Sequence, residues 1–369
     1  MPANKIQHFV PRCYLKPFCA DEHGAAINLF NISRETPIAN APVRGQCARP
    51  YFYGDDGELE RALQGPEGVY ARCVKKAAAD PLALDANDLR ALRALLLLQV
   101  FRSAAWVDRE KALFEAHRDL LEAEATPEFL AEFEYNRGQS IQLAFEMYES
   151  VLPHISDLET CVLVNETDRE FITSDDPAVH TNRYHVQKRL IGGHGFRNSG
   201  AMLFLPMTPE LLLVAFDSNV YKLAGRRAHL ASVSNVHDVE DLNQLQVVHA
   251  ASNLYFRSWS ERTAVAAGHR RGKGGRREHW FELETLQETA PDTGDFAPVF
   301  PPFEHYPDRR EVIHTQQVLP RPDRWCRVLP YTLRPKVIDT GTAAGLVRPT
   351  PLAFARETVR GRASVSDRR

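Results

Sequence analysis

Apolar residues recur every three or four positions through much of the middle of the chain, and this spacing predicts long amphipathic helices. The first helix covers Glu58 to Ala79, where Gly65-Pro66 is expected to break or kink it. The second is the clearest element, since Asp85 or Asn87 can cap its start and helix-forming residues continue to about Glu124. We therefore expect one long, unbroken helix at the centre of the fold.

Two more helices are predicted by capping residues and periodicity. Thr126 followed by Pro127 is typical of a helix start, and that helix is expected to run to about Leu152. A last helix is expected from Val239 to about Leu254. Helices therefore dominate the predicted fold.

Shorter apolar runs bounded by turn residues predict strands. Residues 26–30 alternate as a half-buried strand, and residues 160–164 are expected to pair with residues 171–173. Residues 201–205 and 211–216 are typical of buried strands around a turn at Pro206-Met207-Thr208-Pro209. Together these elements predict an α+β fold that is predominantly helical, in which long central helices pack with a small, mostly antiparallel sheet.

The chain divides by composition into three parts. Residues 1–260 carry the periodic elements and are expected to form the main α+β domain. Residues 261–290 contain a basic loop, Arg270 to Arg277, and a short connecting segment. Residues 291–369 are rich in proline without sustained periodicity, which predicts an irregular extension with a basic, disordered tail.

Composition narrows the class of protein. The composition, with a hydrophobic fraction of 44% and a charged fraction of 25%, predicts a folded, soluble protein. The net charge of -3 predicts no overall electrostatic field that attracts polyanions or anionic membranes. No apolar run is long enough for a transmembrane helix and no signal-peptide pattern opens the chain, so we expect a cytoplasmic protein without a membrane partner. The six cysteines are scattered, and Cys13, Cys19 and His23 match no standard zinc spacing.

Two polar residues interrupt the apolar face of the long central helix. That face consists of Leu92, Leu95, Leu96, Gln99, Arg102, Ser103 and Trp106. Because an unpaired buried guanidinium is very costly, Arg102 must meet a carboxylate, carbonyl groups or a bound anion. Two interpretations stay open: an Arg–Asp pair that fixes helix packing, or a cleft in which Arg102, with Gln99 beside it, receives the phosphate or carboxylate of a ligand.

The segment Thr173-Ser174-Asp175-Asp176-Pro177 places a hydroxyl and two carboxylates at the end of a predicted strand. Adjacent carboxylates repel each other, so one of them is a candidate for a raised pKa, and the pair is a candidate site for a divalent cation. The alternative is an Asx-type turn in which Asp175 or Asp176 accepts hydrogen bonds from backbone amides before Pro177.

Further candidates lie at the two ends of the main domain. His8 belongs to an apolar segment that is expected to dock firmly, where it is either structural or, near a carboxylate, a general acid or base. Asn243 and Gln246 share a face of the last helix, and they either complete a substrate-binding pocket or satisfy buried backbone groups. Residues 192–195 and 270–277 are expected to be solvated loops rather than phosphate sites.

The ordered set of motifs resembles the bacterial DUF4238 family. It begins with Gln7-His8-Phe9-Val10-Pro11 and continues with Tyr51-Phe52-Tyr53, Gln99 and Arg102, the Thr173–Pro177 segment, the Pro206–Pro209 turn, and Leu242-Asn243 through Gln246 to Ala250. The resemblance covers roughly residues 5 to 258 and leaves out the proline-rich C-terminal part. It implies a mostly helical α+β fold and supplies no activity.

Three functions stay open on the sequence. The leading hypothesis is a hydrolase acting on a phosphodiester or nucleotide, nuclease-like and suited to host defence or a toxin, with His8 as acid or base, Arg102 stabilising phosphate charge and Asp175 as base or metal ligand. The predicted substrate-binding residues are Gln99, Ser174, Asn243 and Gln246. The second is a non-catalytic sensor that binds an anion or nucleotide, and the third is a structural or interaction protein with a buried polar network.

Overall fold

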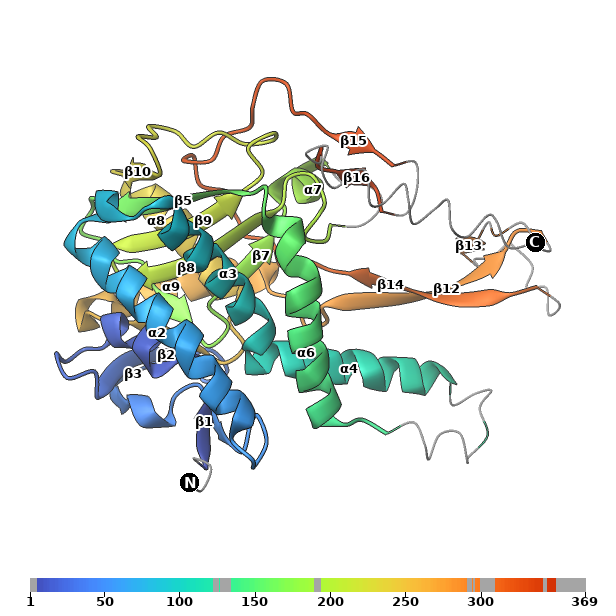
Figure 1. The fold of residues 1–369 in the computed structure, drawn as a ribbon, viewed down its shortest axis with the longest axis horizontal. Helices are drawn as coiled ribbons and strands as arrows, with labels where there is room; N and C mark the ends of the chain where they lie inside the picture. Colours follow the sequence, from blue (N-terminus) through green and yellow to red (C-terminus); the bar gives the residue numbers. More distant parts are fainter. Residues whose placement is uncertain are drawn as a thin grey trace.

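Helices and strands both contribute heavily to the fold. The computed structural model describes residues 5–121, 126, 134–188, 194–290, 294, 296–298, 309–340 and 344–349. It is 40% helical and 25% strand, and its described part holds five sheets (Figure 1). The prediction of a predominantly helical fold with one small sheet is therefore wrong, and the protein is a mixed α/β protein. The sequence underestimates the strand content because periodicity alone does not distinguish a short buried strand from a buried helix segment.

The elements have the following bounds. The helices are α1 Arg12–Leu15, α2 Glu58–Ala79, α3 Ala86–Arg102, α4 Ala104–Leu121, α6 Arg137–Val151, α7 Arg183–Lys188, α8 Val236–His249 and α9 Arg262–Gly272. The strands are β1 Ile6–His8, β2 Ala26–Asn31, β3 Thr36–Pro42, β4 Ala48–Pro50, β5 Glu159–Asn165, β6 Thr173–Ser174, β7 Val179–Thr181, β8 Met202–Thr208, β9 Leu211–Phe216, β10 Leu230–Val233, β11 Asn253–Phe256, β12 Phe281–Glu288, β13 Phe296–Pro298, β14 Glu311–Gln317, β15 Ile338–Asp339 and β16 Leu346–Val347.

A five-stranded sheet in the order β10-β5-β9-β8-β7 forms the centre of the molecule. Its β8–β9 hairpin confirms the predicted strand pair, whereas β10 joins β5 in parallel. Both faces are buried: Leu203 and Leu205 of β8 belong to one core cluster, and the alternating Met202 and Phe204 belong to another. Continuous apolar runs are what a sheet covered on both faces requires.

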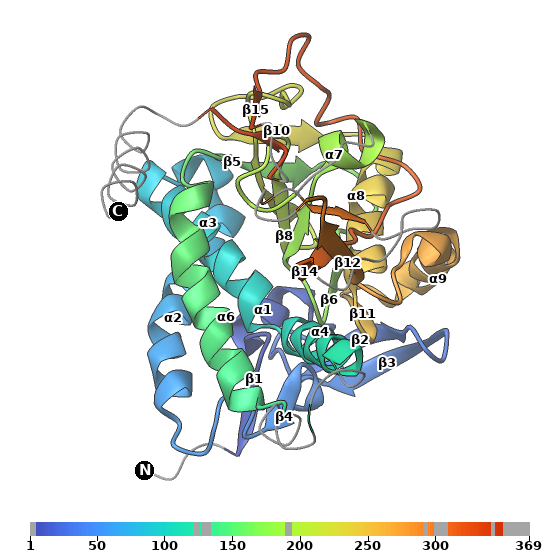
Figure 2. The same cartoon turned by 90° about the vertical axis from the view of Figure 1, so that its right-hand side faces the viewer.

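Helices cover both faces of this sheet, so the body has three layers (Figures 1 and 2). α2, α3 and α6 lie on one face, and α8 lies on the other (Figure 2). α2 continues through Gly65 and Pro66 without a break, because burial of Leu63 and Tyr70 on either side outweighs the hydrogen bond that proline cannot donate. The part of the third predicted helix at residues 127–133 lies outside the described residues; α6 begins after an Asn136 cap.

The predicted long central helix is two helices. α3 ends at Arg102, Ser103 has an extended backbone (ψ 152°), and α4 leaves in a different direction (Figures 1 and 2). The Ser103 hydroxyl accepts a hydrogen bond from the backbone N–H of Trp106 at 3.2 Å, as an N-cap does. The apolar stripe therefore does not continue on one face past Arg102.

A second, four-stranded sheet has the order β3-β2-β11-β6. The strand predicted at residues 26–30 is confirmed as β2. The predicted pairing of residues 160–164 with 171–173 is wrong, because β5 belongs to the central sheet while β6 pairs with β11. The last predicted helix ends early, since α8 stops at His249 and Leu254 lies in β11.

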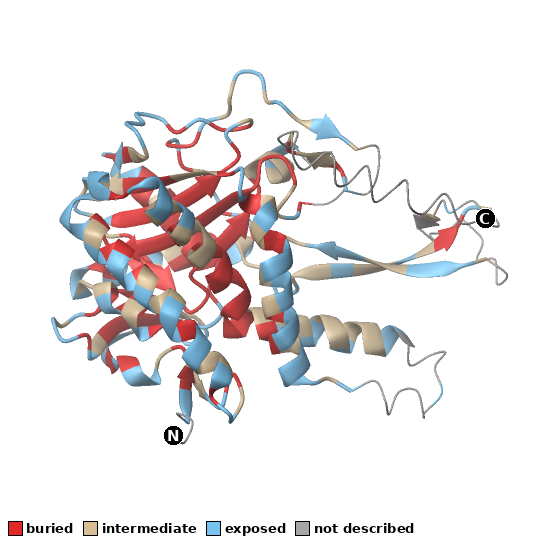
Figure 3. Cartoon of the chain, in the orientation of Figure 1, coloured by how far each residue is buried: buried red, intermediate tan, exposed pale blue. Residues whose placement is uncertain are grey.

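The described residues after 260 contain more helix and strand than we expected, and the basic tail predicted at residues 356–369 lies outside the described residues. Arg270 to Gly275 are not a loop, because they end α9 and form a short 3-10 helix. β12, β13 and β14 form an antiparallel sheet that projects beside α4, and we call α4 together with these strands the arm (Figure 1). The arm is mostly exposed or half-buried (Figure 3). Cys326, Val328 and Leu329 belong to the core cluster that also contains Met202 and Phe204.

Candidate functional site

The N-terminal segment is clamped to α3 by Gln99 and Arg102. Nε2 of Gln99 donates to the carbonyl of Phe9 at 3.1 Å, and Nη2 of Arg102 donates to the carbonyl of His8 at 3.2 Å. His8 is half-buried, and burial, followed by the nearby charge of Arg12, lowers the pKa of its imidazole. Two polar side chains of α3 thus hold the backbone of this segment against the central helix.

Arg102 is fully buried and has a carboxylate partner. Its guanidinium donates to Glu67 at 2.9 Å and to the hydroxyl of Tyr53 at 3.1 Å. The partner is a glutamate on α2, not the aspartate that we considered, but the arrangement is the packing pair of the first interpretation. The cavity beside Arg102 and Gln99 measures only ≈ 20 Å³, which admits about one water molecule.

Asp175 caps a backbone turn elsewhere in the fold. One carboxylate oxygen accepts the N–H of Ala251 at 2.9 Å, and the other accepts the N–H groups of Ser252 and Asn253 at 2.8 and 3.2 Å. Burial, helped by the adjacent charge of Asp176, raises the pKa of Asp175 to about 6 although the three amides oppose it. The geometry therefore joins His8 to Arg102 but gives Asp175 a separate set of partners.

The predicted substrate-binding residues on α8 bond to the backbone of the neighbouring segment. Asn243 accepts from the N–H of Ile172 at 3.0 Å and donates to the carbonyl of Glu170 at 2.9 Å. Gln246 accepts from the hydroxyl of Ser174 and donates to the carbonyl of Pro177, both at 2.8 Å. These contacts match the second interpretation, in which the side chains satisfy buried backbone groups.

Asp175 and Asp176 do not present their oxygens to a common point. Asp175 is occupied by the turn described above, and Asp176 accepts from Ser103 at 2.8 Å and Arg109 at 2.7 Å. Across the described residues no group of three or more His, Cys, Asp and Glu side chains is arranged to hold a metal ion. The geometry therefore offers nothing specific to a divalent cation at this pair.

Asp176 instead faces a bipartite cleft where the arm meets the body, which we call the arm cleft. One part, the aromatic hollow, has a volume of ≈ 330 Å³ and is lined by Phe101, Trp106, Glu110, Asp176, His180 and Phe196 among others. The other part, the arginine hollow, has a volume of ≈ 250 Å³ and is lined by Asp108, Arg276, Arg277, Glu278 and His279 among others. Arg109, His249, Trp280 and Phe281 line both parts.

A chain of contacts crosses the arm cleft from Ser103 to His249. Arg109 bridges Asp176 and the indole of Trp280, and its guanidinium carbon lies 4.3 Å from the Trp280 ring centre. The Trp280 ring then meets the His249 ring edge-on, with centres 5.3 Å apart. Four parts of the chain therefore converge here: α4, the segment before β7, the end of α8 and Trp280, which directly precedes β12.

His249 has one free ring nitrogen. Its Nδ1 lies 3.0 Å from the carbonyl of Leu245, and because a carbonyl can only accept, Nδ1 carries the proton and Nε2 keeps its lone pair. Nε2 is buried and makes no hydrogen bond within the usual distance and angle limits, although a backbone group of His180 lies close enough to raise the pKa of the ring. Burial lowers the pKa of His249 to about 4, while the carboxylate of Asp176 acts in the opposite direction.

Two more titratable residues, His180 and Glu110, line the aromatic hollow. The His180 ring stacks on Phe196 with centres 4.0 Å apart, and burial lowers the pKa of its imidazole to about 3. Burial also raises the pKa of Glu110. Apart from histidines, this hollow is lined by two carboxylates and one arginine, whereas the arginine hollow is lined by three arginines and two carboxylates.

Sequence reasoning missed most of this cleft. Ser103 had a usable signal, since serine is a preferred N-cap and interrupts a stripe of leucines. The sequence indicates Asp176 as a cation ligand with Asp175 or as a turn-forming residue, and neither role predicts its contacts with Ser103 and Arg109. Nothing in the sequence placed Arg109, His180 or Trp280 together, because their contacts join distant segments.

A sequence profile of a family described as a protein of unknown function, DUF4238, matches residues 6–260. No curated protein and no solved structure shows significant similarity to the chain. The matched region includes Asp176, His249 and α4 but ends before Trp280 and the three strands of the arm. None of the described helices combines the length and apolar character that crossing a membrane demands.

Proposed function

The chain belongs to the DUF4238 family, and on that premise we propose that it is a hydrolase that acts on a phosphodiester or nucleotide bound in the arm cleft. The observation that carries the proposal is His249, which lines both hollows and whose Nε2 keeps its lone pair because Nδ1 carries the proton. A neutral histidine oriented through its other nitrogen is the usual form of a general base.

The two hollows complement the two halves of a nucleotide. The aromatic hollow offers Phe101, Phe196 and Trp280 to a planar ring, and Glu110 to its hydrogen-bond donors. The arginine hollow offers the terminal nitrogens of Arg277 to phosphate oxygens, whereas Arg276 already donates to the carbonyls of Val247 and Ala250 at 2.6 and 2.7 Å. A phosphate on the boundary between the hollows would lie beside His249.

The reaction that fits these groups is attack of water on phosphorus. As the water oxygen bonds to phosphorus, its proton passes to Nε2 of His249. The bond between phosphorus and the leaving oxygen breaks, and the imidazolium returns the proton to that oxygen. Asp176 stabilises the positive imidazolium, since its charge favours protonation of His249.

This proposal places the reacting groups differently from the sequence-based hypothesis. The catalytic roles of His8, Arg102 and Asp175 stay predictions, and the hydrogen bonds of Arg102 and Asp175 give both residues a structural role. The substrate class is unchanged, while the base becomes His249 and the substrate-binding residues become those of the arm cleft.

A turnover screen tests the proposal. Wild-type protein is incubated with dinucleotides, mononucleotides and bis(p-nitrophenyl) phosphate, and His249→Ala is compared on any substrate that is cleaved. We expect kcat to fall by roughly 10²- to 10⁴-fold, as for loss of a general base. Trp280→Ala is expected to raise KM with a smaller effect on kcat.

His237→Ala is the matched control, because His237 is an exposed histidine on the same helix that does not line the arm cleft. It is expected to retain the wild-type rate. Equal rates for wild type and His249→Ala, with both proteins folded, would refute the catalytic role.

A second function, nucleotide binding without turnover, is favoured by the low pKa of His249. A base with a pKa of about 4 accepts a hydrogen bond readily but takes a proton from water poorly. Nucleotide-dependent stabilisation that is lost in Trp280→Ala, without product formation by wild type, would support this function over hydrolysis.

A further inference from the structure

A second cavity lies between α8 and α9 and shares no lining residue with the arm cleft. We call it the α8–α9 groove; its volume is ≈ 470 Å³, within the range of small-molecule sites. Its floor is a face of α9 that carries Ala264, Ala267 and Gly268, and its walls include the apolar Ile172 and Val247. Small side chains on the floor leave room for an aliphatic group.

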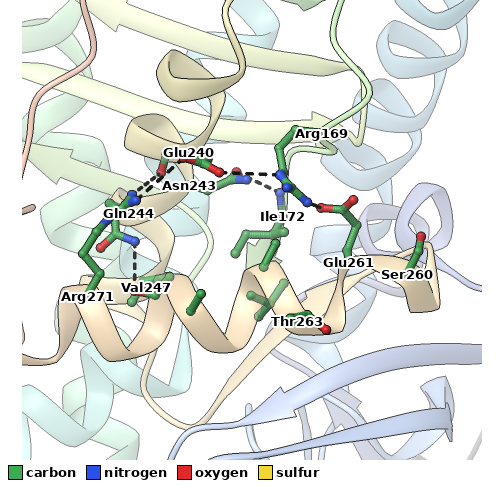
Figure 4. Close-up of a pocket in the computed structure, with 14 residues that line it drawn as sticks. Arg169, Ile172, Glu240, Asn243, Gln244, Val247, Ser260, Glu261, Thr263 and Arg271 are labelled. Atoms are coloured by element: carbon green, nitrogen blue, oxygen red, sulfur yellow. Dashed lines mark hydrogen bonds and ion pairs between the residues drawn. The ribbon is translucent and has the colours of Figure 1, made fainter.

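Charged side chains stand at both ends of the α8–α9 groove (Figure 4). Arg169 pairs with Glu261 at 2.7 Å at one end, and Arg271 lies at the other end, where it pairs with Asp323 at 3.0 Å. Glu240 of α8 stands between the two arginines (Figure 4). The lining therefore holds two guanidinium groups and two carboxylates.

The carboxylate of Glu240 and the guanidinium of Arg169, which we call the two central groups, face each other without a hydrogen bond between them. Oε1 of Glu240 is 3.9 Å from Nε of Arg169, and its other oxygen is 3.8 Å from Arg271. Nε of Arg169 is buried and has no hydrogen-bond partner. Both distances are too long for a hydrogen bond, so Nε of Arg169 and Oε1 of Glu240 remain available to a ligand, whereas Oε2 of Glu240 lies 3.3 Å from Nδ1 of His237.

We propose that the α8–α9 groove binds a small zwitterion with an aliphatic side chain, that is, a free α-amino acid or a dipeptide. Its carboxylate pairs with Arg169, its ammonium group pairs with Glu240, and its side chain lies on the Ala264–Gly268 floor. Because the lining charges balance, a ligand with only one charge leaves one of the two central groups without a partner.

Thermal unfolding with matched small molecules tests this proposal. L-leucine and glycyl-L-leucine are compared with isopentylamine, which lacks the carboxylate, and with 4-methylpentanoate, which lacks the ammonium group. We expect both zwitterions to raise the unfolding temperature in a concentration-dependent way, and each single-charge compound to do so only at concentrations roughly tenfold higher.

Ala267→Leu fills the floor of the groove without changing its charges, and it is expected to abolish the shift. Arg270→Leu places the same side chain at an exposed position of α9 outside the groove and is expected to keep the shift. The proposal is overturned if neither zwitterion stabilises the wild type, if the single-charge compounds act equally well, or if Ala267→Leu responds like the wild type.

Discussion

Buried charged residues in this protein join segments that are distant in sequence. Arg102 ties the N-terminal strand region and α2 to α3, and Asp175 holds the turn before β11. Removing one member of such a group leaves the other members buried and unpaired, which costs more than the net contribution of the intact pair.

Arg102→Met tests this role at the residue scale. The substitution leaves Glu67 and the hydroxyl of Tyr53 without their cationic partner, so the free energy of unfolding is expected to fall by about 3 kcal/mol. Urea denaturation measures the change. Arg49→Met is the control, because the Arg49–Asp108 pair is half-exposed (42% and 54%) and is expected to contribute less than about 1 kcal/mol. Equal losses for the two variants would contradict the account.

At the scale of elements, the break at Ser103 positions the arm cleft. The hydroxyl of Ser103 caps α4 and donates to Asp176, so a single side chain ends the central helix and orients the carboxylate that holds Arg109. An uninterrupted helix would carry Arg109 in another direction, away from Trp280.

Ser103→Ala removes both hydrogen bonds of this hydroxyl. We expect a loss of about 2 kcal/mol in the free energy of unfolding, from the helix cap and from a buried bond to a charged group. Ser103→Thr keeps the hydroxyl and is expected to recover most of that loss. Denaturant titration of the three proteins gives the comparison, and an alanine variant as stable as the threonine variant would exclude the proposed cap.

The pattern of apolar and turn residues predicted several individual helices and strands, but it did not predict which strands or side chains that are distant in sequence lie together. The β8–β9 hairpin and β2 follow from apolar runs and turn residues, and the need of Arg102 for a partner follows from the cost of a buried charge. The assignment of β5 and β6 to different sheets depends on strands that lie far away in sequence. The meeting of His249 with Trp280 likewise depends on where α8 ends and the arm begins, which no local pattern specifies.

At the scale of the whole molecule, buried neutral histidines make stability depend on pH. Burial lowers the pKa of His180 to about 3 and of His194 and His249 to about 4. These residues bind protons below pH 6.5 in the unfolded chain but stay neutral in the folded one, so acid favours unfolding. Asp175 has the opposite sign, since its folded pKa of about 6 lets the native state bind a proton first.

The net effect is a loss of stability on mild acidification. Among the groups with the largest shifts three histidines oppose one aspartate, while His8 adds to the effect of the histidines and Glu110 to that of Asp175, so the free energy of unfolding is expected to fall on the order of 3 kcal/mol between pH 6.5 and pH 5. Denaturant titrations at several pH values measure this slope, and His194→Asn should reduce it. A stability that stays constant or rises over this interval would contradict the buried, neutral state of these residues.

The most direct test of the central claim is a crystal structure of the His249→Ala protein with a dinucleotide, because the variant is expected to bind the substrate without cleaving it. The account predicts a base in the aromatic hollow against Trp280 and a phosphate at the boundary with the arginine hollow, beside position 249. A dinucleotide bound elsewhere, or an arm cleft that stays empty at saturating dinucleotide, would contradict it.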